Sequence, residues 1–298
     1  MWFRSLQVFK FIEDFTESPE NLTGFLEAQR FMPCRTVDMS TQGFVAPNGD
    51  KDGPLVYAAN GFLMFCLQRE DKIVPSTVVK QMLDEKVAEI EIAQGRKVRK
   101  REKENLKEDI MHQLVMRAFS KISKTYAYID TIDGYLVVNA SNHAKAEEFS
   151  VALRGALGSL KIEVPKVQSV TTLLTHWLKT NEYPADFTVN DHCILSDPKD
   201  KGSIRCQRQN LFAEDIQNLI HEGRMVAELG LSWSEQVSFS MKEDFSVKSL
   251  KYLELVQDQS RDVAAETTAA RFDADFTIMA GTLRNLIRGL FEAFGVKA

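Results

Sequence analysis

Two dipeptides that favour tight turns, Asn60-Gly61 and Asp133-Gly134, constrain the fold more than any other feature of this sequence. Each lies between two apolar runs, and a tight hairpin needs turn residues that tolerate positive φ. Segments 55–67 and 125–139 are therefore predicted to form two β-hairpins. The pattern between them is helical, so we expect a helical arm inserted between two hairpins that share one sheet.

The arm, residues 76–118, has two apolar stripes that repeat every three or four residues, the spacing of an amphipathic helix. Their members are Val79, Met82, Leu83, Val87 and Ile90 in the first stripe and Leu106, Ile110 and Leu114 in the second. We expect two helices packed as an antiparallel hairpin with the turn near Arg99–Lys103. A single long helix with a weak point at Gly95 is the alternative.

Positive charge is concentrated at the expected tip of the arm. The whole chain has a net charge of −5, whereas residues 96–107 contain seven cations and only two anions. This window therefore carries +5 and the rest of the chain −10, a polarised distribution that suits binding of a polyanion. A solvated helix face with mixed charges is the alternative. The candidate contacts here are Arg96, Lys97, Arg99, Lys100 and Arg101, with Arg117, Lys121 and Lys124 extending the positive strip beyond the arm.

Two further arginines and one aromatic residue are candidates for binding. Arg205 and Arg208 fall in an expected strand, and we expect them to share one face with Gln207 opposite. An exposed strand face without a ligand is the alternative. Phe119 lies between cations where the second helical stripe ends, and it could pack in the core, stack on a base or contact a second subunit.

The remaining pattern predicts an α+β fold with mixed sheets. A central domain would comprise residues 1–75 and 119–165, and a base domain would comprise residues 166–298 and end in a long helix. The expected helices are 19–30, 142–157, 170–178, 214–222 and a last helix running to about Phe294; the expected strands are 2–11, 187–195, 203–211, 225–231, 236–241 and 247–253; residues 33–54 are expected to be irregular.

The last helix carries an apolar stripe with near-heptad spacing. Such a stripe can be buried within one chain, or it can form a helix–helix seam between two subunits of a dimer. The residues of the stripe are Phe276, Met279, Leu283, Ile287, Leu290 and Phe294.

The sequence contains no phosphate-cradling glycine loop and no nucleophile elbow, and its histidines and four cysteines lack metal-ligand spacing. We therefore expect neither a cofactor nor a metal. Asp273 and Asp275 form the one acidic pair to consider. They could hold a divalent ion for phosphodiester cleavage, but carboxylates just before a helix are favoured by the helix dipole, and we prefer this structural role. An enzyme is not expected.

The composition is that of a globular protein without a membrane anchor. The 298 residues are 44% hydrophobic and 27% charged, and no apolar run approaches the roughly 20 residues needed to cross a bilayer. The N-terminal segment lacks the cleavage site of a signal peptide. Scattered cysteines without a paired pattern are typical of a reducing compartment, so we expect a cytoplasmic protein.

Six segments, spread over nearly the whole chain, together resemble the RdgC family of bacterial recombination-associated proteins. They are MWFRSLQVFK, AANGFLMFCLQREDKIVPSTVVKQ, MRAFSKISKT, YIDTIDG, LRGALGSL and ARFDADFTIM. The resemblance implies a ring-shaped homodimer with a positively lined hole wide enough for duplex DNA. It also implies binding of double- and single-stranded DNA without sequence preference, association with the nucleoid, and limitation of RecA-dependent strand exchange.

The resemblance also assigns residues. One subunit contact would lie between the C-terminal helices, and the other would close the ring through the aromatic of the RAFS motif, here Phe119. A basic residue followed by glutamine on the inner surface aligns with Arg208-Gln209, with arginine where lysine is expected and a neutral Gln207 before it. The competing hypotheses are a protein–protein module that docks an acidic partner through the arm, and a nuclease that uses Asp273 and Asp275.

Overall fold

The computed structural model describes residues 1–200, 202–263 and 265–296. This part of the chain contains eight helices and two sheets, which confirms the α+β class. The expected mixed sheets are wrong, because every pair of neighbouring strands in both described sheets is antiparallel. The first sheet has the order β2-β4-β5-β6-β1-β7, with β3 beside β4; the second has the order β12-β11-β10-β8-β9. The strands of the first sheet are β1 (Gln7–Phe11), β2 (Ser40–Val45), β3 (Tyr57–Ala59), β4 (Phe62–Lys72), β5 (Ser120–Asp130), β6 (Tyr135–Val138) and β7 (Ile162–Glu163). Those of the second are β8 (Phe187–Ser196), β9 (Ser203–Gln207), β10 (Met225–Trp233), β11 (Val237–Lys242) and β12 (Val247–Tyr252).

The two predicted hairpins are present but have different turns. Between β3 and β4, Asn60 and Gly61 have φ values of 50° and 79°, as a two-residue type I′ turn requires. Between β5 and β6 the loop has four residues, 131–134, and only Gly134 has positive φ. Its amide donates to the carbonyl of Asp130 at 3.0 Å, so this glycine closes a longer loop.

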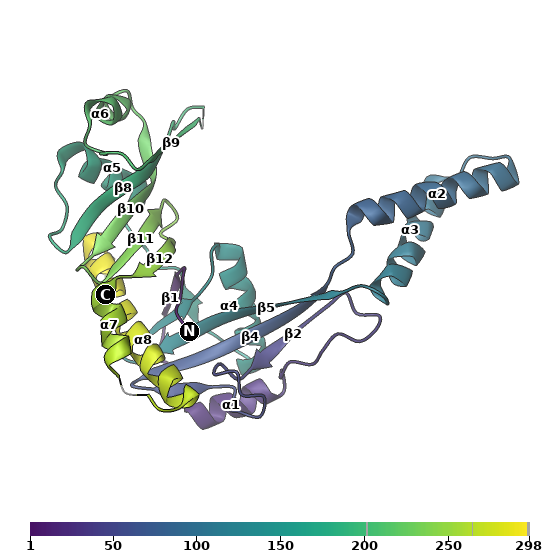
Figure 1. Cartoon of the computed structure of the whole chain (residues 1–298), viewed down its shortest axis with the longest axis horizontal. Helices are drawn as coiled ribbons and strands as arrows, with labels where there is room; N and C mark the ends of the chain where they lie inside the picture. The colour runs from purple at the N-terminus through teal and green to yellow at the C-terminus, as the bar shows by residue number, and fades with distance from the viewer. Residues whose placement is uncertain (201, 264, 297–298) are drawn as a thin grey trace.

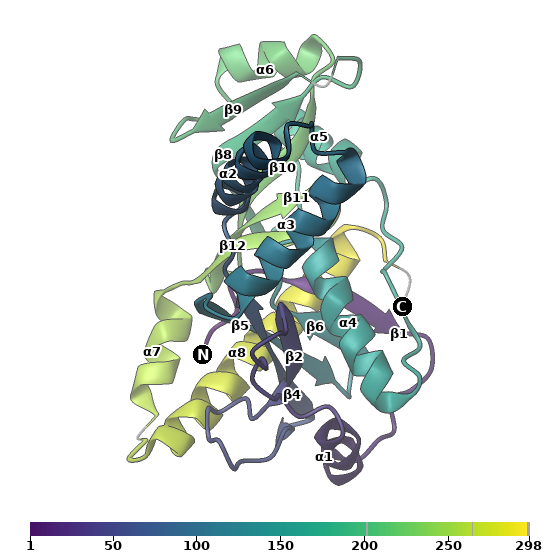
Figure 2. The ribbon, with the colours of Figure 1, turned by 90° about the vertical axis from the view of Figure 1, so that its right-hand side faces the viewer.

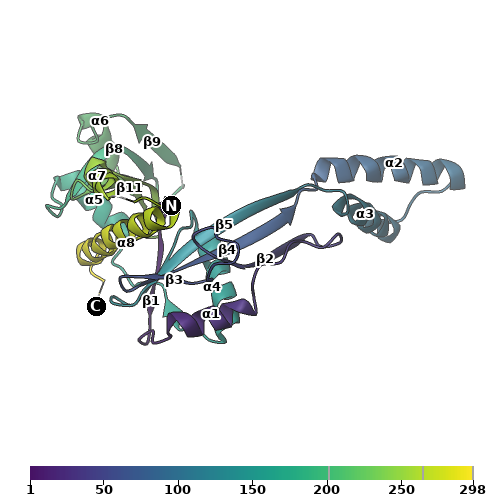
Figure 3. The same ribbon diagram turned by 60° about the horizontal axis from the view of Figure 1, so that its bottom comes forward.

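The arm extends from the long two-stranded ribbon of β4 and β5. These strands pair without interruption from Phe62↔Asp130 to Lys72↔Ser120. Beyond this last pair the chain forms α2 (Ser76–Gln94) and α3 (Lys100–Val115), which fold back on one another and project far from the body (Figures 1 and 3).

The turn of the arm lies closer to the N-terminus than expected. Gly95 takes a left-handed conformation, with φ of 61°, and ends α2, while Arg99 is the N-cap of α3. The turn therefore spans residues 95–99 instead of 99–103, and the alternative of one long helix is wrong. A left-handed residue ends a helix, and glycine adopts this conformation without steric cost.

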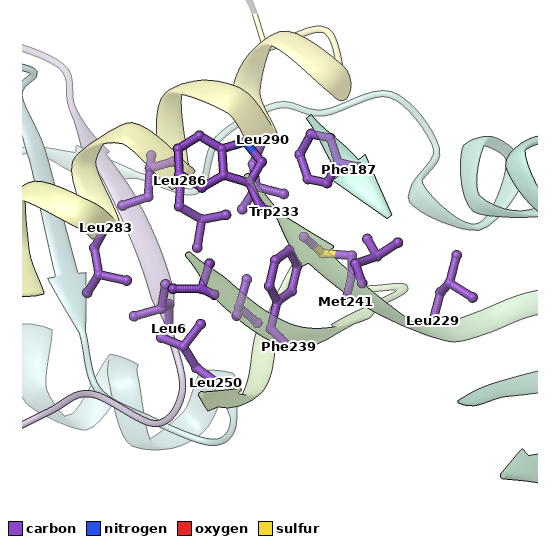
Figure 4. Packing of buried hydrophobic residues seen from close by; sticks show 14 of the residues in the cluster. Leu6, Phe187, Leu229, Trp233, Phe239, Met241, Leu250, Leu283, Leu286 and Leu290 are labelled. Carbon is purple, nitrogen blue, oxygen red and sulfur yellow. The ribbon is translucent and has the colours of Figure 1, made fainter. Parts of the chain in front are cut away.

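Two buried clusters lie on opposite faces of the first sheet. On one face α1 (Pro19–Glu27) and α4 (His143–Leu157) pack against the sheet, with Phe44 and Phe149 in edge-to-face contact. On the other face α8 (Thr268–Ala293) lies between the two sheets, and side chains of both sheets join it in one core. Figure 4 shows Leu283, Leu286 and Leu290 of α8 turned toward the second sheet.

The apolar stripe of α8 is part of the core of the single chain. All six predicted residues of the dimer seam are at most 2% exposed. Side chains that are already buried cannot present a surface to a second subunit, so their assignment to a dimer interface is corrected. Any subunit contact made by α8 would have to use its outer face.

Two arginines of α8 bind the loop of the second hairpin. Arg284 donates to both carboxylate oxygens of Asp130 at 2.6 and 2.8 Å and lies 4.0 Å from the centre of the Phe62 ring. One turn further on, Arg288 donates to both oxygens of Asp133 at 2.7 Å. These pairs join the terminal helix to the first sheet.

Several local expectations are corrected by the structure. The first strand begins only at Gln7, and β2 lies within the segment expected to be irregular. The first helix ends at Glu27, with Phe25 on its exposed side. A helix that was not expected, α7 (Glu254–Asp262), follows β12.

The outline of the chain is an open hook. The second sheet rises at one end of the body, and the arm projects from the other (Figure 1). Helices α5 (Val170–Thr180) and α8 lie on the side of the second sheet that faces away from the arm, and α6 (Glu214–His221) lies at its outer end. Among the residues that the structure describes, no helix lies on the other face of this sheet, which is turned toward the arm (Figures 1 and 2).

Candidate nucleic-acid interface

The tip of the arm presents the predicted cations to solvent. All five candidates between residues 96 and 101 are exposed. The loop that carries them is anchored by Val98, which is buried and whose amide donates to a carboxylate oxygen of Glu91 at 3.0 Å. Arg96 is held by Glu102 through two hydrogen bonds of 2.8 and 2.9 Å, and this contact raises the pKa of the guanidinium and lowers that of the carboxyl. Within the described residues the other four cations make no ion pair.

The base of the arm carries exposed apolar side chains. Phe119 is 86% exposed, and Ile73, Met116 and Ile122 beside it are each at least half exposed. The amide of Ile73 donates to the carbonyl of Phe119 at 2.8 Å, which fixes the backbone where the chain enters and leaves the arm. Core packing is thus excluded for Phe119, which leaves stacking or a subunit contact.

A groove about 420 Å³ in volume lies on the same arm. Val79 and Leu83 of α2 and Met111 of α3 supply its apolar lining, and Lys80 and Lys107 stand at its edge.

The three remaining cations of the strip do not form one surface. Arg117 is exposed just after α3. Lys121 and Lys124 are both exposed on β5, but residues three apart on a strand point to opposite faces. Lys121 is the direct strand partner of Asp71, whose carboxylate is paired with Arg69.

The expectation that Arg205 and Arg208 share a strand face is wrong. Strand β9 ends at Gln207, and Arg208 has a φ of 54°, which breaks the strand. Side chains alternate along a strand, so Gln207 is the residue on the same face as Arg205. Arg208 and Gln209 are exposed in the following turn, where the Gln209 amide donates to the carbonyl of Asp191 at 3.2 Å.

Apart from Arg117, Lys121 and Lys124 at the base of the arm, the candidate cations form two groups. One group is at the tip of the arm and the other is at the β9 edge of the second sheet, at opposite ends of the hook (Figure 1). The single chain does not bring these two groups together.

Sequence reasoning missed the polar surface next to Arg208. The uncovered face of the second sheet carries His192 of β8, Ser238 and Ser240 of β11, and Lys251 of β12. The available signal was the alternation Ser238-x-Ser240-x-Lys242, which predicts one polar sheet face.

The acidic pair has structural partners. Asp273 accepts a hydrogen bond from the Tyr57 hydroxyl at 2.8 Å, and Asp275 accepts one from Ser260 at 2.7 Å and lies 3.4 Å from Arg271. Both lie within α8, which begins five residues before Asp273, so they do not precede the helix as expected. Among the described residues no group of three or more histidine, cysteine or acidic side chains could hold a metal ion. Across the same residues, none of the helices has the length and apolar character needed to cross a bilayer.

Comparison with known proteins places these features in context. Residues 1–297 match the family model RdgC, described as "Putative exonuclease, RdgC". The chain is 39% identical over 297 residues to the recombination-associated protein RdgC of Aeromonas hydrophila subsp. hydrophila and 38% identical over 297 residues to that of Tolumonas auensis, with 99% of this chain and 98% of each relative covered. It is 36% identical over 300 residues to the protein of the same name from Yersinia pestis, with 100% of this chain and 99% of the relative covered.

Proposed function

This chain belongs to the RdgC family, and we propose that it is a non-catalytic DNA-binding protein that acts on recombination as a ring-shaped homodimer. The observation that carries the proposal is the placement of positive charge. Exposed cations lie at the arm tip and at the β9 edge, on the two limbs of one concave side, in a chain that is acidic overall.

Charge of this kind binds nucleic acid through its phosphates. Lysine and arginine neutralise phosphates and release counterions, which gives affinity without reading the sequence. The acidic remainder of the chain would repel DNA from the outer surface. The candidate contacts are the arm cations Arg96 to Arg101, together with Arg117, Arg205, Arg208 and Gln209.

A second copy would close the hook into a ring. Phe119 is the exposed aromatic at the base of the arm, and a groove between α2 and α3 offers an apolar site for a partner's ring. A two-fold contact would use both features twice, once from each subunit. A ring that surrounds DNA would occupy the substrate on which RecA assembles, and this would limit strand exchange in the nucleoid.

The test is fluorescence anisotropy with a labelled duplex of random sequence, titrated at several salt concentrations. Each neutralised phosphate contributes about −0.9 to the slope of log K against log salt, so several contacts should give about −4 or steeper. Arg208→Ala should flatten the slope by about 0.9. Arg261→Ala, on α7 at the side away from the arm, is the matched control and should leave it unchanged.

The same preparation separates the competing functions. Absence of binding at low salt would reject the DNA-binding proposal and leave the arm as a docking element for an acidic protein. Cleavage of the labelled duplex in Mg²⁺, abolished by Asp273→Ala, would reject the non-catalytic assignment. We expect intact DNA, because Asp273 and Asp275 are each engaged by neighbouring side chains.

A further inference from the structure

A polar hollow on the uncovered face of the second sheet lies outside the two groups of cations described above. Its volume is about 420 Å³, and β8, β11 and β12 line it. The side chains that could contact a ligand are Asn190, His192, Ser238, Ser240, Ser249 and Lys251. The hollow adjoins the turn of Arg208 and Gln209, because Gln209 is bonded through its amide to Asp191 at the rim.

The imidazole of His192 crosses one strand to reach its partner. It extends from β8 over Gly230 of β10, and its Nε2 lies 2.8 Å from the hydroxyl of Ser240 on β11. A Cβ on residue 230 would lie 2.1 Å from the ring, so only glycine leaves room for this arrangement. The ring is therefore held in one position, and Ser240 beneath it is 3% exposed.

The strands on both sides of the hollow are irregular. The register of β8 on β10 shifts between Leu229 and Leu231, and that of β12 on β11 shifts between Ser238 and Ser240. Ser249, in the second irregularity, has a φ of 52°, which is uncommon for a residue other than glycine. Bulges and strained residues of this kind redirect side chains and concentrate at binding sites.

The chemistry of the lining suits a phosphate group. Lys251 supplies a positive charge, and the hydroxyls of Ser238 and Ser249 and the Asn190 amide supply neutral donors. Hydroxyl, amide and cationic side chains are the groups that contact phosphate oxygens in DNA complexes. The one carboxylate at the rim, Asp191, is 64% exposed and lies 3.7 Å from Nδ1 of His192.

We propose that this hollow binds one phosphodiester group of the DNA backbone, held by Lys251 and the hydroxyls of Ser238 and Ser249, with the fixed imidazole of His192 as one wall. This inference rests on the proposed DNA-binding function and names one of its contact sites. The uncovered face is turned toward the concave side where DNA would lie (Figures 1 and 2).

The groups that face the imidazole are Asp191 beside it, Gln207 opposite it on β9, Gly230 beneath it, Ser240 on β11 and Lys251 on β12. The ring therefore forms one fixed wall of the hollow, and Lys251 supplies the positive charge that a phosphate would contact.

The experiment measures the anisotropy salt slope of the full-length protein with the random duplex. Lys251→Gln should flatten the slope by about 0.9, the effect of one neutralised phosphate lost. His192→Gln should lower the affinity, because the ring that forms one wall of the hollow is lost. Arg261→Ala on α7 is again the control and should behave as the wild type.

The outcomes distinguish failure of the site from failure of the function. If the wild type binds with a steep slope but His192→Gln and Lys251→Gln both bind as the wild type does, the hollow is not a phosphate site although the protein binds DNA. If the wild type does not bind at all, both the DNA-binding function and this site are rejected. Lys251 is exposed, so its substitution tests the site without disturbing the fold. Thermal unfolding of each variant should confirm this.

Discussion

Replacing Arg284 by alanine should destabilise the protein far more than the same change at Arg288. Asp130, the partner of Arg284, is only 2% exposed and accepts two bonds from the guanidinium. It also accepts hydrogen bonds from the backbone amides of Ile132 and Asp133, at 3.0 and 3.1 Å. Removal of Arg284 leaves a buried carboxylate with two backbone donors and no counter-charge.

The magnitude follows from the burial of the two pairs. Loss of one partner from a buried ion pair costs about 3–5 kcal/mol, because the remaining charge stays buried without compensation. The Arg288–Asp133 pair has the same two-bond geometry, but Arg288 is 53% exposed. Exposed pairs contribute about 0.2–1 kcal/mol. The two pairs share the same ionic chemistry and differ mainly in burial, although Asp133 is itself only 12% exposed and Arg284 also lies over the Phe62 ring. Arg288→Ala is therefore the matched control.

Urea unfolding followed by circular dichroism measures the difference. A loss of 3 kcal/mol lowers the folding equilibrium constant more than about 100-fold, since about 1.4 kcal/mol corresponds to a factor of ten. The double variant Asp130→Asn/Arg284→Ala should recover part of the loss, because it removes the uncompensated charge. Equal destabilisation by Arg284→Ala and Arg288→Ala would refute the argument from burial.

Three further changes test other parts of the structure. Phe119→Ala should leave the unfolding midpoint unchanged, because the ring is 86% exposed. Sedimentation of the same variant should show a weaker dimer than the wild type. A drop in the unfolding midpoint would mean that the ring is part of the fold. Burial acts to raise the pKa of Asp244, but hydrogen bonds from Ser246 outweigh it and hold the pKa below its ordinary value. The contribution of Asp244 to stability is therefore present above about pH 4 and is lost as pH falls through the folded-state pKa. Asp244→Asn should consequently lower the unfolding midpoint near neutral pH and have no effect in strong acid. Cys66, Cys193 and Cys206 are buried, and burial also raises the pKa of the Cys66 and Cys193 thiols to about 12, so a thiol reagent should label only the half-buried Cys34 until urea is added.

The local features that sequence could predict are those whose cause is local. Asn60-Gly61 determines its turn because two adjacent residues with positive φ admit few alternatives. Asp133-Gly134 is also a turn-forming dipeptide, but here the loop is four residues long. Its conformation is held by Asp130, which accepts hydrogen bonds from both the loop amides and Arg284. The second interaction spans 154 positions, so no local window contains it.

The candidate site was less predictable than the fold. The stripe of α8 has the same apolar pattern whether it faces a sheet of its own chain or a second helix, and only the position of the two sheets decides between them. The direction of Arg208 depends on where β9 ends, and one residue of error turns a side chain to the other face. The contact of His192 with Ser240 depends on strand order, since β10 is inserted between their strands.

The ribbon that supports the arm makes the arm a replaceable unit. The chain leaves the sheet at Lys72 and returns at its direct partner Ser120, so the two ends of the insertion are neighbours. Whole turns could be added to or removed from both helices together without a change in strand register, at 1.5 Å of reach per residue. The size of an opening closed by two such arms can therefore evolve separately from the body that carries it, and designed proteins with longer or shorter arms should fold on the same scaffold.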